Sequence, residues 1–265
     1  MKIFIIQNKK YIRQTAILLV WLLFWQILYF FVQKDVLIAS PVSVAKAFLS
    51  LCKEYDFWLT ILASLCRILA GYLFSVFFGI LFAVFCYNNA FVHALLQPAI
   101  QTIKATPVVS FSILVLLWVK TDFVPIIISF LMVFPLIWTN TTIGIRQTQK
   151  QYLEMAKAYG FSSFKTLRYI YVPSVFPYFL SACHAGIGMA WKAGIAAEVI
   201  CTPSVSMGKK IYETKIYLET PELFVWTICA IIFSIILEKL FLKLLYYFSK
   251  RIGISYEPKN NIAIS

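Results

Sequence analysis

Long apolar runs separated by short polar segments dominate this 265-residue chain. The runs fall at about 12–33, 57–87, 98–119, 123–143, 174–200 and 222–248. Each approaches or exceeds the roughly 20 residues that a helix needs to cross a bilayer. Because backbone polar groups in lipid must be paired within their own segment, each run predicts a helix. The pattern therefore predicts an all-α polytopic membrane protein with about six transmembrane helices.

Composition supports this class of protein. Hydrophobic residues make up 61% of the chain and charged residues 13%, and the mean hydropathy is +0.82. A soluble domain is roughly 45–50% apolar and about 25% charged. The first apolar run is longer than the core of a signal peptide, so we predict an uncleaved first helix. We divide the chain into an N-terminal helix with an outside segment (1–57), a core of membrane spans (58–250) and a cytoplasmic tail (251–265).

Basic residues set the predicted orientation. With the N-terminus inside, 14 of the 24 Lys and Arg residues fall on inside segments, 7 on outside segments and 3 within spans. This twofold enrichment follows the positive-inside rule and predicts that both termini are cytoplasmic. Segment 146–173 then faces the cytoplasm. The net charge of +13 is distributed over the membrane flanks, which argues against a nucleic-acid-binding surface.

Reactive side chains indicate little chemistry. The six cysteines form no C-x-x-C pair, and His93 and His184 are far apart without an H-E-x-x-H pattern. We therefore predict neither a metal site nor a cofactor. The segment nearest to a nucleotide-binding loop has Pro203 where Gly is required and Lys210 in place of Ser or Thr. We expect no ATPase activity in this chain and do not expect it to be an enzyme.

The segment from Glu154 to Pro173, EMAKAYGFSSFKTLRYIYVP, is the only charged stretch of any length between two long apolar runs. Glu154 opens a short helical run, and Gly160 breaks it because glycine tolerates conformations that strain other residues. Ser162 or Ser163 can cap a second run, which Pro173 ends. The sequence therefore predicts a compact helix–turn–helix on the cytoplasmic side.

Small and apolar side chains suit this helix–turn–helix to contact with a partner. Ala156, Ala158 and Gly160 allow another surface to approach closely. On the second run, Leu167, Ile170 and Tyr171 form an apolar edge. The alternative interpretation is an ordinary amphipathic connector between two spans.

The segment also follows the spacing of a known motif. Its residues Glu154, Ala156, Gly160, Ile170 and Pro173 stand in the order E-x-A-x-x-x-G-x(9)-I-x-x-P. This order resembles the EAA cytoplasmic loop of ABC-importer permeases, which docks on the ATPase subunit. Met155 and Val172 replace the usual Ala and Leu, and both are apolar. The resemblance implies that residues 146–173 form the coupling loop, with Ala158 also at the contact.

The resemblance extends over roughly residues 35–250. The matching stretches are Ser40-Pro41 with Val44 and Phe48, Ser64 to Gly71, Trp191 with Ala197-Glu198, and Met207-Gly208. They are similar to the nitrate/sulfonate/taurine branch of these permeases, which also includes permeases for thiamine-precursor pyrimidines. The implied fold is the type I ABC importer (MetI-like) permease fold, whose core of five spans crosses alternately to the two sides.

The resemblance also implies an activity and partners. Such a permease forms the pathway for a small solute by alternating access in the bacterial inner membrane. The solute would be a sulfonate-, nitrate- or taurine-like anion or a pyrimidine. The implied partners are a second permease copy, two ABC ATPase subunits that hydrolyse the ATP, and an extracytoplasmic solute-binding protein. We expect a homodimer of the permease, with a heterodimer left open.

Charged residues within the spans need a partner, water or an interface, because lipid does not solvate them. Arg67 should therefore face protein. Lys192 and Glu198 are six residues apart, so they lie on different faces of a helix and cannot simply pair. Lys192 either snorkels to the interface or meets an anionic solute, and Glu198 is either a gate contact or a scaffold contact. With Trp191, they are the candidate residues of the translocation pathway.

Other functions compete with this interpretation. A secondary transporter driven by an ion gradient predicts inverted repeats and paired carboxylates within the membrane, and the sequence shows neither. An integral membrane enzyme predicts a cluster of His, Asp or Glu at one membrane face, against which the two scattered histidines argue. A channel would not require a patterned cytoplasmic loop.

Overall fold

The computed structural model describes residues 2–252, which form helices joined by short turns, with no strand among them. In chain order the helices are α1 (Lys2–Val32), α2 (Pro41–Leu51), α3 (Tyr55–Asn88), α4 (Ala90–Ala105), α5 (Val108–Leu116), α6 (Val124–Arg146), α7 (Lys150–Ala158), α8 (Ser163–Thr166), α9 (Val172–Cys201), α10 (Met207–Ile216) and α11 (Thr220–Ile252). A 3-10 turn, η1 (Thr121–Phe123), precedes α6, and a π-helical turn, η2 (Leu167–Tyr171), precedes α9. The predicted all-α class is confirmed. Of the predicted tail 251–265, residues 253–265 lie outside the described residues.

Several helices are long enough to cross a bilayer. By length and composition, four segments of the described chain are candidate spans: Thr15–Val32, Tyr55–Tyr87, Thr121–Arg146 and Ser163–Cys201. Helices α4 and α5 are long and apolar enough for a span only when they are taken together. The sixth predicted segment lies on α11, a helix of 33 residues that is not among these candidate spans. The described residues therefore contain four candidate spans, or five with the α4–α5 pair, against the six or so predicted.

The third predicted span is broken. The sequence predicts one helix over about 98–119, whereas α4 and α5 meet at an angle of 108°. Thr106 between them is extended, with φ −79° and ψ 127°, and Pro107 caps α5. The residue before a proline disfavours the helical region, and proline has no N–H to continue the helical hydrogen bonds. The chain therefore turns at this point.

Helix α6 forms the centre of the bundle and packs along both α3 and α9. Glycines permit these close crossings, because a Cβ on Gly71 of α3 would lie 2.3 Å from the carbonyl oxygen of Ile126 in α6. A Cβ on Gly194 of α9 would lie 2.8 Å from the Ser129 hydroxyl oxygen in α6. Small residues at helix crossings are the usual means of close packing in membranes.

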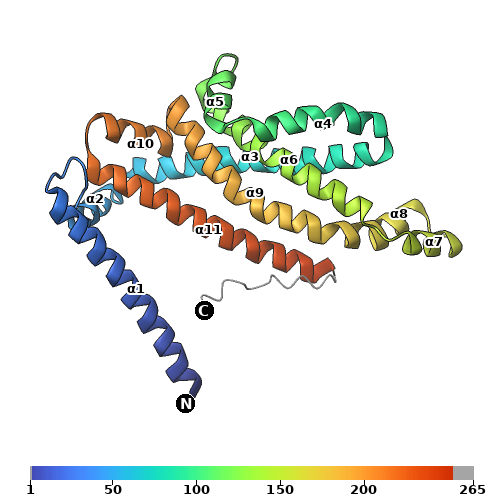
Figure 1. Cartoon of the computed structure of the whole chain (residues 1–265), viewed down its shortest axis with the longest axis horizontal. Helices are drawn as coiled ribbons and strands as arrows, with labels where there is room; N and C mark the ends of the chain where they lie inside the picture. The colour runs from blue at the N-terminus through green and yellow to red at the C-terminus, as the bar shows by residue number, and fades with distance from the viewer. Residues whose placement is uncertain (1, 253–265) are drawn as a thin grey trace.

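Short helices lie at the two opposite ends of the bundle (Figure 1). Helices α7 and α8 lie at one end, and the short helices α2 and α10 lie at the other. Ser40 and Ser206 cap these last two helices by accepting hydrogen bonds from the amides of Ser43 and Lys209. Helix α1 diverges from the rest of the bundle, and its candidate span buries none of its residues.

Candidate functional site

The predicted helix–turn–helix is present at the end of the bundle that carries α7 and α8. Helix α7 ends at Ala158, and two residues further on Gly160 has a φ of +64°, in the left-handed region that favours glycine. The amide of Phe161 donates to the carbonyl of Ala156 at 2.9 Å, and the amide of Gly160 donates to that of Lys157 at 3.1 Å. This pair of bonds is a Schellman motif, which satisfies the last carbonyls of a helix. The prediction that Gly160 ends the first run is confirmed.

The second run begins as predicted but does not end where predicted. The Ser162 hydroxyl caps α8 by accepting a hydrogen bond from the amide of Lys165. Pro173, however, does not end the run, because it lies in the first turn of α9 and the chain stays helical through it. In η2 the amide of Val172 donates to the carbonyl of Leu167, five residues back. The widened turn and a bond from the Ser174 hydroxyl to the carbonyl of Ile170 (2.8 Å) accommodate the proline.

The six predicted coupling residues divide between buried and exposed positions. Ala156 and Ile170 are buried, Pro173 is half-buried, and Glu154, Ala158 and Gly160 are exposed. The buried pair fixes how the segment packs, whereas the exposed three are available to a partner.

Sequence inspection missed the exposed aromatic residues of the same segment. Tyr159 is 76% exposed and Phe164 is 68% exposed, and Tyr152 and Met155 on α7 are also exposed. Large side chains of this kind, exposed together at a polar end of a membrane protein, are typical of a protein–protein contact surface. We call Tyr152, Met155, Tyr159 and Phe164 the aromatic face of the helix–turn–helix.

Positive charge surrounds this aromatic face. Residues 146–173 contain five basic residues and one acidic residue, Glu154. All five basic side chains (Arg146, Lys150, Lys157, Lys165 and Arg168) are exposed, and none forms an ion pair within residues 2–252. The Arg168 guanidinium lies 5.9 Å from the centre of the Tyr169 ring. The segment can therefore meet an acidic partner surface.

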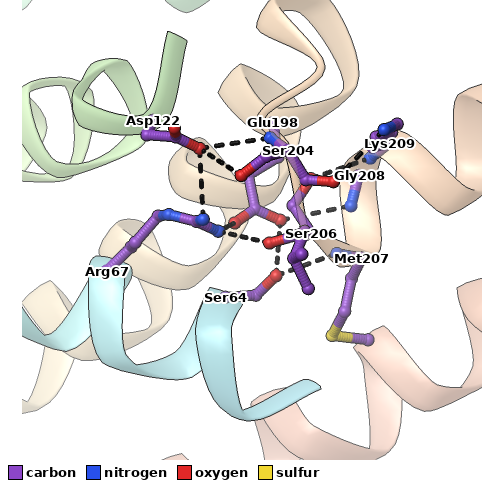
Figure 2. Close-up of polar contacts among 10 residues, drawn as sticks. Ser64, Arg67, Asp122, Glu198, Ser204, Ser206, Met207, Gly208 and Lys209 are labelled. Carbon is purple, nitrogen blue, oxygen red and sulfur yellow. Dashed lines mark hydrogen bonds and ion pairs between the residues drawn. The ribbon is translucent and has the colours of Figure 1, made fainter. Parts of the chain in front are cut away.

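A second cluster of polar residues lies at the opposite end of the bundle (Figure 2). Glu198 of α9 is fully buried, at 0% exposure. Its Oε2 accepts hydrogen bonds from the Ser64 hydroxyl at 2.7 Å and from the Gly208 amide at 3.1 Å. Ser64 in turn accepts a bond from the amide of Met207 at 2.9 Å. One carboxylate thus joins α3, α9 and the first turn of α10.

Arg67 extends this cluster to the start of α6. Its Nη1 lies 3.7 Å from Oε1 of Glu198 and donates to the carbonyl of Val205 at 2.6 Å. Its Nη2 lies 3.3 Å from Oδ1 of Asp122 in η1. The same oxygen accepts bonds from the amide and hydroxyl of Ser204, at 3.1 and 3.0 Å. The prediction that Arg67 faces protein is confirmed. We call Ser64, Arg67, Asp122, Glu198 and the backbone of 204–208 the outer polar network.

The three candidate pathway residues lie in different surroundings. Trp191 is buried in the packing between α9 and α11, and its Nε1 donates to the carbonyl of Ala230 at 2.9 Å. Glu198 is enclosed in the outer polar network, as a scaffold contact would be. Lys192 alone is exposed. It shares a face of α9 with the exposed Met189 and with Gly188, where an added Cβ would contact nothing within 4 Å.

Asp122 is the member of the outer polar network that the sequence interpretation missed. It is the only acidic residue between Asp56 and Glu154, and this isolation could have singled it out. Its partners are 55 and 82 residues away in sequence, so no local pattern indicates the contacts. Among residues 2–252 no group of three His, Cys, Asp or Glu residues is placed to hold a metal ion.

Comparison with known proteins agrees with the family to which the coupling loop points. Residues 75–254 match the family described as "Binding-protein-dependent transport system inner membrane component". This stretch includes the helix–turn–helix, the outer polar network apart from Ser64 and Arg67, and all of α9.

Several relatives carry names from the same group. The bicarbonate transport system permease protein CmpB of Synechococcus elongatus is 28% identical over 158 residues, which cover 59% of this chain and 56% of the relative. The nitrate import permease protein NrtB of the same organism is 30% identical, covering 54% of this chain and 51% of the relative. The taurine transport system permease protein TauC of Escherichia coli is 23% identical, covering 70% of this chain and 69% of the relative. The chain thus spans little more than half the length of the bicarbonate and nitrate relatives.

Proposed function

Because this chain belongs to the family of binding-protein-dependent transport system inner membrane components, we propose that it is the permease subunit of an ABC importer for a small anion. It is embedded in the membrane, and residues 58–250 would form the core that lines the pathway. ATP would be hydrolysed by a separate subunit, since no nucleotide-binding loop is found in the sequence.

The helix–turn–helix of α7 and α8 is the observation that carries this proposal. It presents an aromatic face and five exposed basic side chains at one end of the bundle. It also runs without interruption into α9 through η2. Because α9 packs along α6 and α11, a displacement of α7 and α8 would be transmitted to the centre of the bundle. An ATPase docked on the aromatic face could therefore move the spans.

The expected mechanism is alternating access. Two permease copies, which we expect to be identical, would each bind one ATPase subunit at the cytoplasmic end. A loaded solute-binding protein would dock at the opposite end, beside α2 and α10. ATP binding would bring the two helix–turn–helix segments together and favour the outward-open state. A partner shifts this equilibrium only by its differential affinity for the two states, and coupling of about 1–3 kcal/mol is typical.

The proposed solute is a small anion of the type that the relatives are named for: bicarbonate, nitrate or taurine. Lys192 is the residue that supports an anionic solute, because it is a basic side chain exposed in the middle part of α9. Trp191 and Glu198 would hold α9 against its neighbours so that Lys192 keeps its place. A pyrimidine solute, taken by other members of this branch, is the less favoured choice since it offers no negative charge to Lys192.

A secondary transporter is the alternative function. It would require carboxylates that act together within the membrane. Here Glu198 is committed to Arg67 and Ser64, and Glu238 lies 3.3 Å from His184 between α9 and α11. The two carboxylates therefore belong to separate contacts, and neither is paired with the other.

The proposal is tested by co-purifying the chain with its candidate ATPase. Gly160→Pro cannot adopt a φ of +64° and removes the amide that bonds to Lys157, so it should break the turn. Glu154→Arg reverses the only negative charge of the segment. Both variants should lose the ATPase and its stimulated turnover while the permease stays folded. Glu219→Arg, an exposed acidic site at the opposite end, is the matched control for charge reversal and should still co-purify with the ATPase. Normal assembly and turnover in the first two variants would contradict the proposal.

A further inference from the structure

An apolar groove opens beside the helix–turn–helix, at the end of the bundle that the charge pattern assigns to the cytoplasm. Its volume is about 520 Å³. The walls come from the C-terminal part of α3 (Ile80, Val84), the end of α6 (Ile145) and the η2–α9 junction (Leu167, Phe176). Val84 and Leu167 are 47% and 51% exposed, so the groove is open to its surroundings. A pocket of this size, within the ~300–1,000 Å³ of ligand sites, can hold a small molecule or a hydrocarbon chain.

Hydroxyl groups mark one side of this otherwise apolar groove. The Tyr87 and Tyr171 hydroxyls lie 3.3 Å apart at its edge, and Ser163 is also part of the lining. Thr141 of α6 lines the groove too and is only 3% exposed. Its Oγ1 has no hydrogen-bond partner among the described residues. A buried hydroxyl usually has a hydrogen-bond partner, and a ligand with an acceptor oxygen would supply one for Thr141.

The position of the groove matches the depth at which the chains of a lipid meet its head group. Thr141 lies five residues before Arg146, which is about 7.5 Å along the axis of α6. Tyrosines are enriched at the membrane–water interface, where Tyr87 and Tyr171 would lie. Arg146 and Arg168 each lie one residue beyond a lining residue, Ile145 and Leu167, which places them about 100° around the helix from the groove. Both are exposed, and their long side chains can reach a head group at the mouth of the groove from this neighbouring face. An acyl chain, an ester oxygen and an anionic head group would therefore each meet a complementary part of the site.

We propose that this groove binds one acyl chain of an anionic phospholipid from the cytoplasmic leaflet. The acyl chain lies along Val84 and Phe176, and the ester carbonyl of the lipid accepts a hydrogen bond from the Thr141 hydroxyl. The lipid phosphate lies near Arg146 and Arg168. Positive charge favours an anionic lipid over a zwitterionic one, because basic residues attract the negative surface of the cytoplasmic leaflet. Because η2 is one wall of the groove, the bound lipid supports the junction through which α8 continues into α9.

The test is native mass spectrometry of the full chain in detergent with an equimolar mixture of dioleoylphosphatidylglycerol and dioleoylphosphatidylcholine. The wild type should retain phosphatidylglycerol in preference to phosphatidylcholine. Val84→Trp fills the groove and should lose most of the bound lipid, whereas Phe85→Trp, at an exposed neighbour outside the lining, should not. Arg168→Gln should weaken phosphatidylglycerol retention about fivefold, as expected for one basic residue near an anionic lipid. Lys157→Gln on α7 is the control for this charge change.

Leu167→Trp repeats the groove-filling test on the opposite wall, with Phe164→Trp as its control outside the lining. Loss of bound lipid in both Val84→Trp and Leu167→Trp, with lipid retention unchanged in both controls, would support the site. If one groove variant folds poorly, the other still tests it. Equal retention of both lipids by the wild type would overturn the anionic specificity. Lipid retention by Val84→Trp and Leu167→Trp equal to that of their controls would overturn the site. A permease dimer lost in both groove variants, with lipid retention unchanged, would assign the groove to a second copy instead.

Discussion

The amide of Gly208 donates to Oε2 of Glu198 at 3.1 Å, and this bond seats the first turn of α10 on the end of α9. The approach leaves no room for a side chain at residue 208, because a Cβ there would lie 2.3 Å from the Glu198 Cβ and 2.4 Å from the Val199 amide nitrogen. A carboxylate at the start of α10 is also favoured by the positive end of the helix dipole. Glu198 and Gly208 therefore depend on each other: one supplies the charge and the other supplies the space.

Gly208→Ala should destabilise the chain strongly. The added methyl group would meet backbone atoms of α9 that cannot move without shifting the helix, and overpacking of this kind costs about 1–3 kcal/mol or more. The measurement is the free energy of unfolding in detergent. The matched control is Gly188→Ala, also within the bundle, where the new Cβ meets nothing within 4 Å. That change should be neutral or stabilising by about 0.5–1 kcal/mol, since alanine favours helix. Equal effects of the two substitutions would contradict the structure at Gly208.

Glu198→Ala should lower the free energy of unfolding by about 1–3 kcal/mol, because it removes the buried acceptor for the Ser64 hydroxyl and the Gly208 amide. Arg67 would keep its other carboxylate partner, Asp122. The same unfolding measurement applies. Glu213→Ala is the control, since Glu213 pairs with Lys209 at 3.7 Å at a site where both side chains are about one-third exposed. An ion pair as exposed as that contributes about 0–1 kcal/mol. If Glu198→Ala cost no more than Glu213→Ala, the outer polar network would not be a stabilising element.

Gly160→Ala should loosen the helix–turn–helix without affecting the rest of the bundle. The position has open space for a Cβ, so the cost comes from the φ of +64° and is about 1–2 kcal/mol. Gly160→Asn should cost less, because asparagine enters the left-handed region more readily. Hydrogen exchange at the amides of α7 measures the effect: exchange should be fastest in Gly160→Ala, intermediate in Gly160→Asn and slowest in the wild type. Identical exchange in all three would show that the Schellman turn is not what holds α7.

The sequence predicted the features that depend on local chemistry. Apolar runs of sufficient length become helices because lipid leaves the backbone no other way to pair its polar groups, and each of the six runs is helical in the structure, one of them broken. Gly160 and Ser162 were predicted correctly because their effects on a turn and a cap act within a few residues. The EAA spacing led to the correct family for the same reason, as it lies within one segment.

Features that depend on contacts between distant segments could not be predicted. Ser64 meets Glu198 across 134 residues, and Arg67 meets Val205 across 138. Thr106 and Pro107 account locally for the break between α4 and α5, but they do not set its angle of 108°, since a proline is also compatible with a milder kink. Pro173 was predicted to end a helix because proline usually interrupts helical hydrogen bonding. The π-helical turn η2 and the bond of the Ser174 hydroxyl, which keep the chain helical here, depend on the folded structure. Local rules therefore describe the elements, whereas the outer polar network follows from their packing.

Lys192→Gln should reduce import without affecting assembly. If Lys192 contacts the anion during passage, the loss of a charge-assisted interaction of about 1.5–3 kcal/mol should slow uptake at least about tenfold. The measurement is uptake of nitrate, bicarbonate and taurine into proteoliposomes that contain the assembled importer, with ATPase co-purification as the check on assembly. Lys239→Gln is the matched control, because Lys239 is another exposed lysine of a long apolar helix but lies on α11. Wild-type uptake by an assembled Lys192→Gln importer would remove Lys192 from the pathway, whereas equal losses in both variants would point to a general effect of charge on insertion in the membrane.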